Sequence, residues 1–210
     1  MLRQALSGAI LLTGLLYLVA LRQPGRPVRY LLKPVPMLLI TALAAVGAHN
    51  ARSWLVVAGL AISIVGDICL LWPDRWFRHG LGAFLVAHIL YTGAFVLGAP
   101  GIGVWDVSTL LLLSAAAIAV FQRLRIGVMA AGGGSLLVAV GVYMAVITLM
   151  VWRATMTGNP FVAVGGLLFY LSDATLAWNR FARPIRGAEY AVMITYYAAQ
   201  FCLALSLTLP

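Results

Sequence analysis

Eight apolar stretches, separated by short polar links, leave this chain few possible folds. A helix that crosses the roughly 30 Å hydrocarbon core of a bilayer needs about 20 mostly apolar residues. The stretches cover residues 4–21, 34–50, 54–72, 81–99, 105–121, 132–152, 160–178 and 188–208. The sequence therefore predicts an all-α polytopic membrane protein, a bundle of about eight transmembrane helices.

The composition excludes a soluble globular domain. Hydrophobic residues make up 63% of the chain and charged residues 9%, and the mean hydropathy is +1.02. We expect one transmembrane helical domain over residues 1–210. The first stretch lacks a small-residue cleavage site, so it is predicted to be a retained helix and not a signal peptide.

The basic residues fall mainly on one side of this arrangement. Eleven follow the first, third, fifth and seventh stretches, namely Arg22, Arg26, Arg29, Lys33, Arg75, Arg78, Arg123, Arg125, Arg180, Arg183 and Arg186. The opposite side holds Arg3, Arg52 and Arg153. Cytoplasmic links carry the excess of Lys and Arg, so both termini are predicted to lie outside the cytoplasm. The net charge of +9 then reflects topology and contact with anionic lipid, and no nucleic-acid partner is expected.

Two aspartates stand inside apolar stretches, Asp67 in GLAISIVGDICLLW and Asp173 in GGLLFYLSDATLAW. An ionisable group within a spanning segment is costly, so it usually faces the bundle interior and has a function. Both aspartates begin the pattern D-x-x-L-x-W, and a shift of 106 residues also places Tyr91 on Tyr197. These matches raise the possibility of a 4+4 parallel repeat, although so few matches in an apolar sequence also arise by chance.

Further polar side chains are predicted to gather in the cytoplasmic half with the aspartates. His88 and Tyr91 share one helix face at a spacing of three residues. Tyr196 joins these two and the aspartates as a catalytic candidate. The candidates for substrate binding are Lys33, Tyr143, Ser172, Glu189, Tyr197 and Gln200, with Tyr143 expected near mid-depth. Each has an ordinary alternative: a hydrogen-bonded structural histidine, aromatic filler, or a charge that reaches the interface. The aspartates themselves could instead serve only to hold neighbouring helices together, but uncharged polar residues do this at a lower free-energy cost.

These segments resemble the lysoplasmalogenase, or YhhN-like, family of integral membrane proteins. The resemblance covers about residues 30–205 and lies in Lys33-Pro34, Gly66-Asp67, Ala87-His88 with Tyr91, Tyr143, Phe169 with Ser172-Asp173, and Thr195-Tyr196-Tyr197 with Ala199-Gln200. It implies a bacterial inner-membrane enzyme that hydrolyses the vinyl ether bond of lysoplasmalogens. The expected products are a fatty aldehyde and glycerophospho-ethanolamine or glycerophosphocholine.

The residues suit that chemistry. Vinyl ethers hydrolyse by slow proton transfer to the β-carbon, which gives an oxocarbenium ion that water captures. Burial favours the protonated form of one aspartate, and a neighbouring carboxylate is able to stabilise the cation. The sequence does not say which aspartate has which role. His88, Tyr91 and Tyr196 are expected to orient water or the ether oxygen.

Partners and rival functions follow from the same residues. We expect a lysophospholipid substrate surrounded by membrane lipids, with its phosphate held by Lys33, Arg75, Arg78 or Arg180, unless these charges only set topology. No metal or other cofactor is expected, because the cluster lacks the several His or Cys ligands of a hydrolytic zinc site. The alternatives are a proton-coupled transporter of small molecules or lipids, an intramembrane aspartyl protease and a structural subunit. The oligomeric state stays open.

Overall fold

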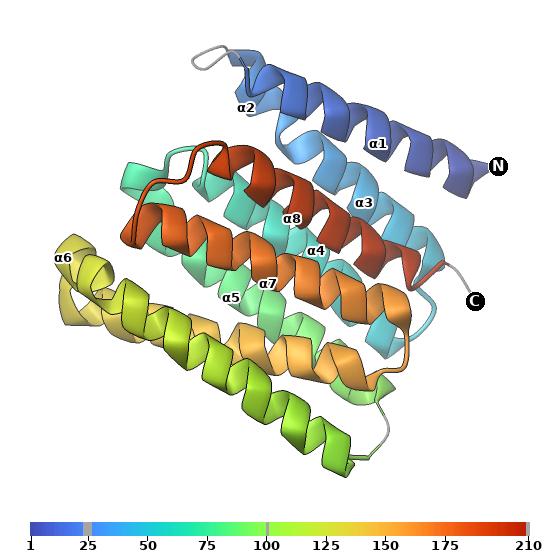
Figure 1. The fold of residues 1–210 in the computed structure, drawn as a ribbon. Helices are drawn as coiled ribbons and strands as arrows, with labels where there is room; N and C mark the ends of the chain where they lie inside the picture. Colours follow the sequence, from blue (N-terminus) through green and yellow to red (C-terminus); the bar gives the residue numbers. More distant parts are fainter. Residues whose placement is uncertain (23–26, 100, 209–210) are drawn as a thin grey trace.

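The computed structural model describes residues 1–22, 27–99 and 101–208, and its regular secondary structure in these ranges is α-helical (Figure 1). The helices lie roughly side by side in one bundle. They are α1 (Leu2–Ala20), α2 (Pro27–Leu32), α3 (Pro34–Gly47), α4 (Ala51–Cys69), α5 (Pro73–Gly98), α6 (Val104–Met156), α7 (Pro160–Phe181) and α8 (Ala188–Leu205).

Helix α6 is two helices joined at a sharp bend. Gly132 and Gly133 have non-helical backbone angles, and Gly133 has a φ of 66°, a conformation that favours glycine. In Figure 1 the segments 104–131 and 134–156 both extend from this bend toward the same side of the bundle, so the chain runs along them in opposite directions. The glycine triplet therefore turns the chain back across the bundle.

Each predicted apolar stretch corresponds to a helical segment in the described ranges. In the described ranges, six helical segments are long and apolar enough to cross a membrane, with α2 and α3 taken together and the bent α6 counted once; α8 is not among the six. The prediction of a polytopic all-α membrane protein is confirmed. The 4+4 parallel repeat stays a prediction.

Some helices extend beyond the predicted apolar stretches. Helix α5 begins at Pro73 and not near residue 81, and the first half of α6 continues past residue 121 to the bend. Proline is favoured at the first helical position, and a helix continues through polar residues once it leaves the hydrocarbon. Arg75, Arg78, Arg123 and Arg125 therefore lie on helices and not in loops.

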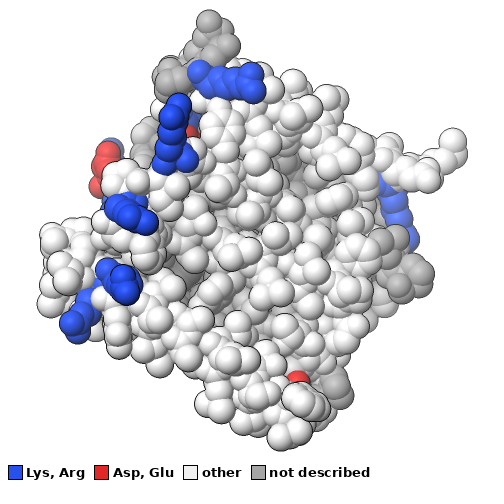
Figure 2. Space-filling view, viewed as in Figure 1, with Lys and Arg blue, Asp and Glu red and all other residues white. Residues whose placement is uncertain are grey.

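Basic side chains gather at the end of the bundle that holds α2, the α4–α5 and α7–α8 links and the bend in α6 (Figures 1 and 2). Arg29, Arg75, Arg180 and Arg183 belong to this basic end. Arg26 lies outside the described residues. The clustering is consistent with the uneven distribution of charge along the sequence.

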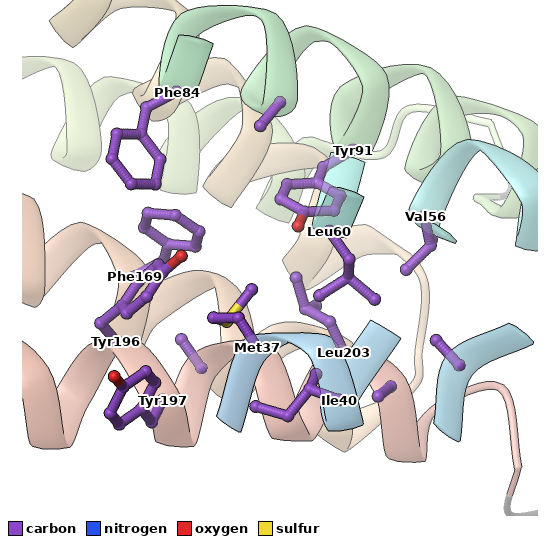
Figure 3. Packing of buried hydrophobic residues seen from close by; sticks show 14 of the residues in the cluster. Met37, Ile40, Val56, Leu60, Phe84, Tyr91, Phe169, Tyr196, Tyr197 and Leu203 are labelled. Carbon is purple, nitrogen blue, oxygen red and sulfur yellow. The ribbon is translucent and has the colours of Figure 1, made fainter. Parts of the chain in front are cut away.

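A buried core holds the helices together around a group of aromatic rings (Figure 3). Phe169 contacts Phe84 and Tyr196 edge to face, with ring centroids 6.2 and 5.4 Å apart. Helix α4 approaches α5 closely at Gly66, where an added Cβ would lie 2.6 Å from the Phe84 ring. The core thereby fixes α4, α5, α7 and α8 around the two aspartates.

Candidate functional site

Asp67 lies two residues before the end of α4, at Cys69, and its side chain is buried with 3% of the residue exposed. Tyr196 of α8 donates a hydrogen bond from its hydroxyl to Asp67 Oδ2 at 2.7 Å. Hydrogen bonds to an ionised carboxylate are stronger than those between neutral groups. The pair joins two helices that are 129 positions apart in the sequence.

Asp67 faces a cavity of about 450 Å³, which we call the polar cavity. This volume is within the usual range for small-molecule sites, roughly 300–1,000 Å³. Three basic side chains line it, Arg29, Lys33 and Arg180, together with Glu189 at the start of α8. Arg29 forms an ion pair with Glu189, which links α2 to α8 beside the cavity. The cavity thus combines carboxylates with an excess of positive charge.

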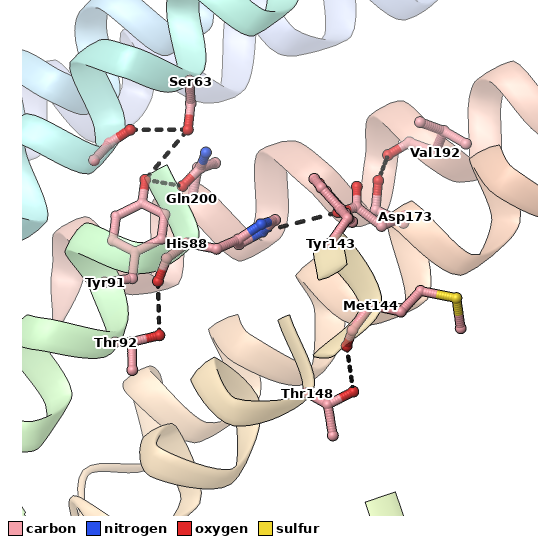
Figure 4. Close-up of polar contacts among 12 residues, drawn as sticks. Ser63, His88, Tyr91, Thr92, Tyr143, Met144, Thr148, Asp173, Val192 and Gln200 are labelled. Carbon is pink, nitrogen blue, oxygen red and sulfur yellow. Dashed lines mark hydrogen bonds and ion pairs between the residues drawn. The ribbon is translucent and has the colours of Figure 1, made fainter. Parts of the chain in front are cut away.

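Asp173, on α7, lines the same cavity, and 17% of its side chain is exposed. The hydroxyl of Tyr143 donates to Asp173 Oδ2 at 2.5 Å. His88 Nε2 lies 3.8 Å from the same oxygen (Figure 4), which is beyond hydrogen-bond distance. The predicted convergence of Asp67 and Asp173 on one cavity is therefore what the structure shows.

His88 is completely buried beside Asp173. Its ring packs edge to face against Tyr143 and Phe169, with centroids 5.2 and 4.7 Å away. Within the described ranges, neither ring nitrogen has a hydrogen-bond partner. Buried polar atoms are seldom left unpaired, and His88 does not itself line the polar cavity.

A second, smaller cavity of about 70 Å³ lies between α5, both halves of α6 and α7. We call it the apolar cavity, because its wall consists mainly of Leu, Val, Phe, Met and Ala side chains. Five of the described residues line both cavities, namely Leu70, Phe77, Phe84, Asp173 and Leu176. Asp173 is the polar member of that group and stands where the two cavities meet.

Tyr91 and Gln200 form a separate buried network. Tyr91 donates to Gln200 Oε1 at 2.8 Å, and its hydroxyl is 3.5 Å from Ser63 Oγ (Figure 4). Both residues are 0% exposed, and neither lines the polar or the apolar cavity. The structure therefore places these two predicted site residues behind the cavity wall.

Two further predicted residues connect helices around the site. Ser172 Oγ donates to the carbonyl of Val192 at 3.0 Å and joins α7 to α8. The Tyr197 hydroxyl donates to the carbonyl of Lys33 at 2.7 Å and fixes the junction of α2 and α3. Ser172 lines the polar cavity, whereas Tyr197 acts on the backbone beside it.

Several residues of the polar cavity were not among the predicted site residues. Tyr17 of α1 and Asn179 of α7 line it, and Arg29 was interpreted only as a topology charge. Tyr17 is the single aromatic residue of α1, and this was the available signal for it. Arg75 and Arg78, considered as phosphate ligands, do not line this cavity; Arg78 instead donates to the carbonyl of Gly132 at 3.1 Å.

The arrangement is suited to acid–base chemistry on a molecule with both polar and apolar parts. Two carboxylates, each hydrogen-bonded to a tyrosine, share a cavity with basic side chains. In the ranges that the structure describes, no three His, Cys, Asp or Glu side chains are grouped as metal ligands. The fold and site define a polytopic helical membrane protein with a paired-aspartate cavity near one end of the bundle.

Comparison with known proteins places the chain in a family. The model of the YhhN family matches residues 28–207, and the chain belongs to that family. It is 39% identical to lysoplasmalogenase TMEM86B of Sus scrofa over 181 residues, covering 85% of this chain and 74% of the relative.

Two other relatives extend this comparison. Lysoplasmalogenase TMEM86B of Homo sapiens is 35% identical over 181 residues, covering 84% of this chain and 74% of the relative. The membrane protein YhhN of Escherichia coli O157:H7 is 26% identical over 189 residues, covering 86% and 88%. No solved structure matches the chain.

Proposed function

We propose that this protein is a membrane-embedded lysoplasmalogenase. It hydrolyses the vinyl ether bond of a 1-alkenyl lysophospholipid and releases a fatty aldehyde and a glycerophospho-ethanolamine or glycerophosphocholine. Membership of the YhhN family and the identity of 35–39% to lysoplasmalogenases over most of the chain support the reaction.

The observation that carries the chemical proposal is the shared cavity of Asp67 and Asp173. One carboxyl group protonates the vinyl β-carbon, and the other, as an anion, stabilises the oxocarbenium ion and orients the water that attacks it. The hemiacetal then collapses to aldehyde and free glycerol hydroxyl. General acid–base assistance of this kind typically contributes about 10²–10⁴-fold.

Lys33, Arg29 and Arg180 bind the phosphate of the lysolipid in this proposal. All three line the polar cavity, and Lys33 is 7% exposed, so its charge acts in a partly water-excluded place. Charge-assisted hydrogen bonds from Lys and Arg to phosphate oxygens are short and strong. Glu189, Ser172 and Tyr197 support this binding region by their contacts with Arg29, Val192 and the Lys33 carbonyl.

The contacts of the remaining predicted residues suggest their roles. His88 lies against Asp173 and holds a water molecule or returns a proton to that carboxyl group. Tyr196 and Tyr143 orient Asp67 and Asp173 through their hydroxyl groups. Tyr91 and Gln200 act from behind, by fixing α5 against α8.

The basic end of the bundle faces the cytoplasm in this proposal, and both termini lie on the other side. The excess of Lys and Arg at that end supports this orientation. The paired aspartates then lie in the cytoplasmic half of the bacterial inner membrane, where lysolipid from the inner leaflet reaches them.

The test is aldehyde release by the purified protein in detergent micelles that contain a 1-alkenyl lysophospholipid. The proposal predicts aldehyde and a glycerophospho product in equal amounts, and none from the corresponding saturated alkyl ether. A proton-coupled transporter needs two compartments and would leave the substrate intact. Intact substrate in micelles, followed by uptake in proteoliposomes, would replace the enzyme proposal with the transporter.

A further inference from the structure

The polar and the apolar cavity meet at Asp173, so the two aspartates stand in different positions relative to a bound vinyl ether. Asp173 lines both the polar and the apolar cavity, whereas Asp67 lines only the polar one. A 1-alkenyl lysolipid has the same division, with a charged headgroup on one side of the ether bond and a hydrocarbon chain on the other.

We infer that the lysolipid binds across both cavities, so that Asp173 is the proton donor and Asp67 the stabilising anion. This inference rests on the proposed function and deepens it. The phosphate lies in the polar cavity with Lys33, Arg29 and Arg180, and the alkenyl chain enters the apolar cavity between α5, α6 and α7. The vinyl ether then lies at the junction.

The position of the accepting carbon fixes the roles. In the group O–CH=CH–R, the β-carbon that accepts the proton is bonded to the chain R, so its acid must lie on the chain side. Asp173 is on that side. The positive charge develops on the α-carbon and the ether oxygen, on the headgroup side, where Asp67 lines the wall.

The contacts of the two carboxyl groups agree with this division. Asp67 lines only the polar cavity, with its three cations, and accepts a hydrogen bond from Tyr196, an environment suited to an anion. Asp173 accepts a hydrogen bond from Tyr143 through Oδ2, but it also borders the apolar cavity and the buried His88 ring, 3.8 Å away, surroundings that suit a neutral acid.

The reaction balances with water as the only co-reactant. Asp173 adds its proton to the β-carbon as the C=C π electrons form the new C–H bond. Water, losing a proton to Asp67, adds to the α-carbon. The hemiacetal hydroxyl then gives up its proton as the C–O bond to glycerol breaks, the glycerol oxygen gains a proton, and the aldehyde leaves. The proton that Asp67 took from water passes through the polar cavity to Asp173, which restores both carboxyl groups.

The size of the apolar cavity limits how much chain it holds. At about 70 Å³ against about 450 Å³ for the polar cavity, it accommodates only the first few carbons beyond the vinyl group. The rest of the chain passes between the half-buried side chains of Val120 and Met144 toward the bilayer.

Photo-crosslinking tests the binding pose without any turnover. The probe is a saturated 1-alkyl lysophosphocholine with a diazirine on the first methylenes of its chain. We expect crosslinks in α6, at Val120, Val140 or Met144, that excess unlabelled lipid abolishes. The variant Val120→Phe lowers this labelling about tenfold, whereas Ala119→Phe, at the neighbouring exposed position, leaves it unchanged. Competable crosslinks on α1 or α8 would reverse the pose and overturn the inference.

Hydrolysis in D₂O tests the roles. A fixed acid delivers deuterium to one face of the β-carbon, so the wild-type aldehyde, reduced to alcohol as it forms, carries one configuration at C2. The residual aldehyde from Asp67→Asn keeps that configuration. Asp173→Asn, which lacks the fixed acid, gives a mixture of both configurations at C2. The opposite pattern would overturn the assignment. Absence of aldehyde from wild type would instead refute the proposed function, while the crosslinks still report the pose.

Discussion

Asp67 and Asp173 begin the same local pattern, D-x-x-L-x-W, yet their surroundings differ. Asp67 is 3% exposed and faces basic residues of α2, the α2–α3 junction and α7 across the polar cavity. Asp173 contacts Tyr143 and lies 3.8 Å from His88, at the edge of an apolar cavity. Identical sequence patterns therefore acquire different chemistry from the helices packed around them.

The largest expected effect is the loss of either carboxylate. Asp67→Asn and Asp173→Asn each reduce turnover by about 10²–10⁴-fold, because one removes the anion and the other the acid. Aldehyde release measures the effect, and a size-exclusion profile checks folding. Asp74→Asn, on an exposed position of α5, serves as the control and keeps wild-type activity. Full activity in either site variant would remove that aspartate from the mechanism.

The next effect comes from the tyrosines that hold the two carboxylates. Tyr196→Phe and Tyr143→Phe remove one hydrogen bond each, worth about 1.5–3 kcal/mol when the partner is charged. A loss of roughly 10–100-fold in kcat is expected. Because Asp67 is the anion in our account, Tyr196→Phe has the larger effect of the two. A larger loss of kcat in Tyr143→Phe would indicate that Asp173, and not Asp67, is the anion.

A smaller effect is expected for the basic wall of the polar cavity. Lys33→Met weakens binding of the phosphate and raises KM by about tenfold, equivalent to roughly 1.4 kcal/mol, with little change in kcat. Arg52→Gln, at the opposite end of the bundle, is the matched control. Equal KM values for both variants would mean that Lys33 only contributes to topology.

The smallest effect on catalysis concerns the network behind the cavity wall. Tyr91→Phe removes the hydrogen bond to Gln200 and leaves activity within about threefold. Its cost is in stability, roughly 1 kcal/mol, because a buried acceptor loses its partner. Thermal unfolding and aldehyde release are measured on the same preparation. A loss of activity as large as that of Tyr196→Phe would place Tyr91 in the reaction.

The all-α membrane fold and the convergence of the aspartates were predictable from the sequence. Long apolar stretches have few alternatives to transmembrane helices, and a carboxylate within such a stretch must face the interior. The start of α5 at Pro73 was missed because a helix need not end where its apolar run ends. The short helix α2 has no apolar run of its own to reveal it.

The partners of each site residue were less predictable. Nothing in the local sequence says that Tyr196 contacts Asp67 or that Tyr143 contacts Asp173, because these pairs depend on which helices are neighbours. For the same reason Tyr91, which shares a helix face with His88, was predicted at the site but lies behind it. Tyr17 lines the cavity because α1 packs beside it, and the sequence of α1 has no polar pattern that predicts this packing.

Aldehyde release by Asp67→Asn, Asp173→Asn and the double variant shows whether the two carboxyl groups act together. If the two carboxylates act on one substrate in one transition state, their effects are strongly non-additive. The double variant is then expected to be about as slow as the slower single variant. Losses that multiply in the double variant would show that the two aspartates work independently, and would contradict the account.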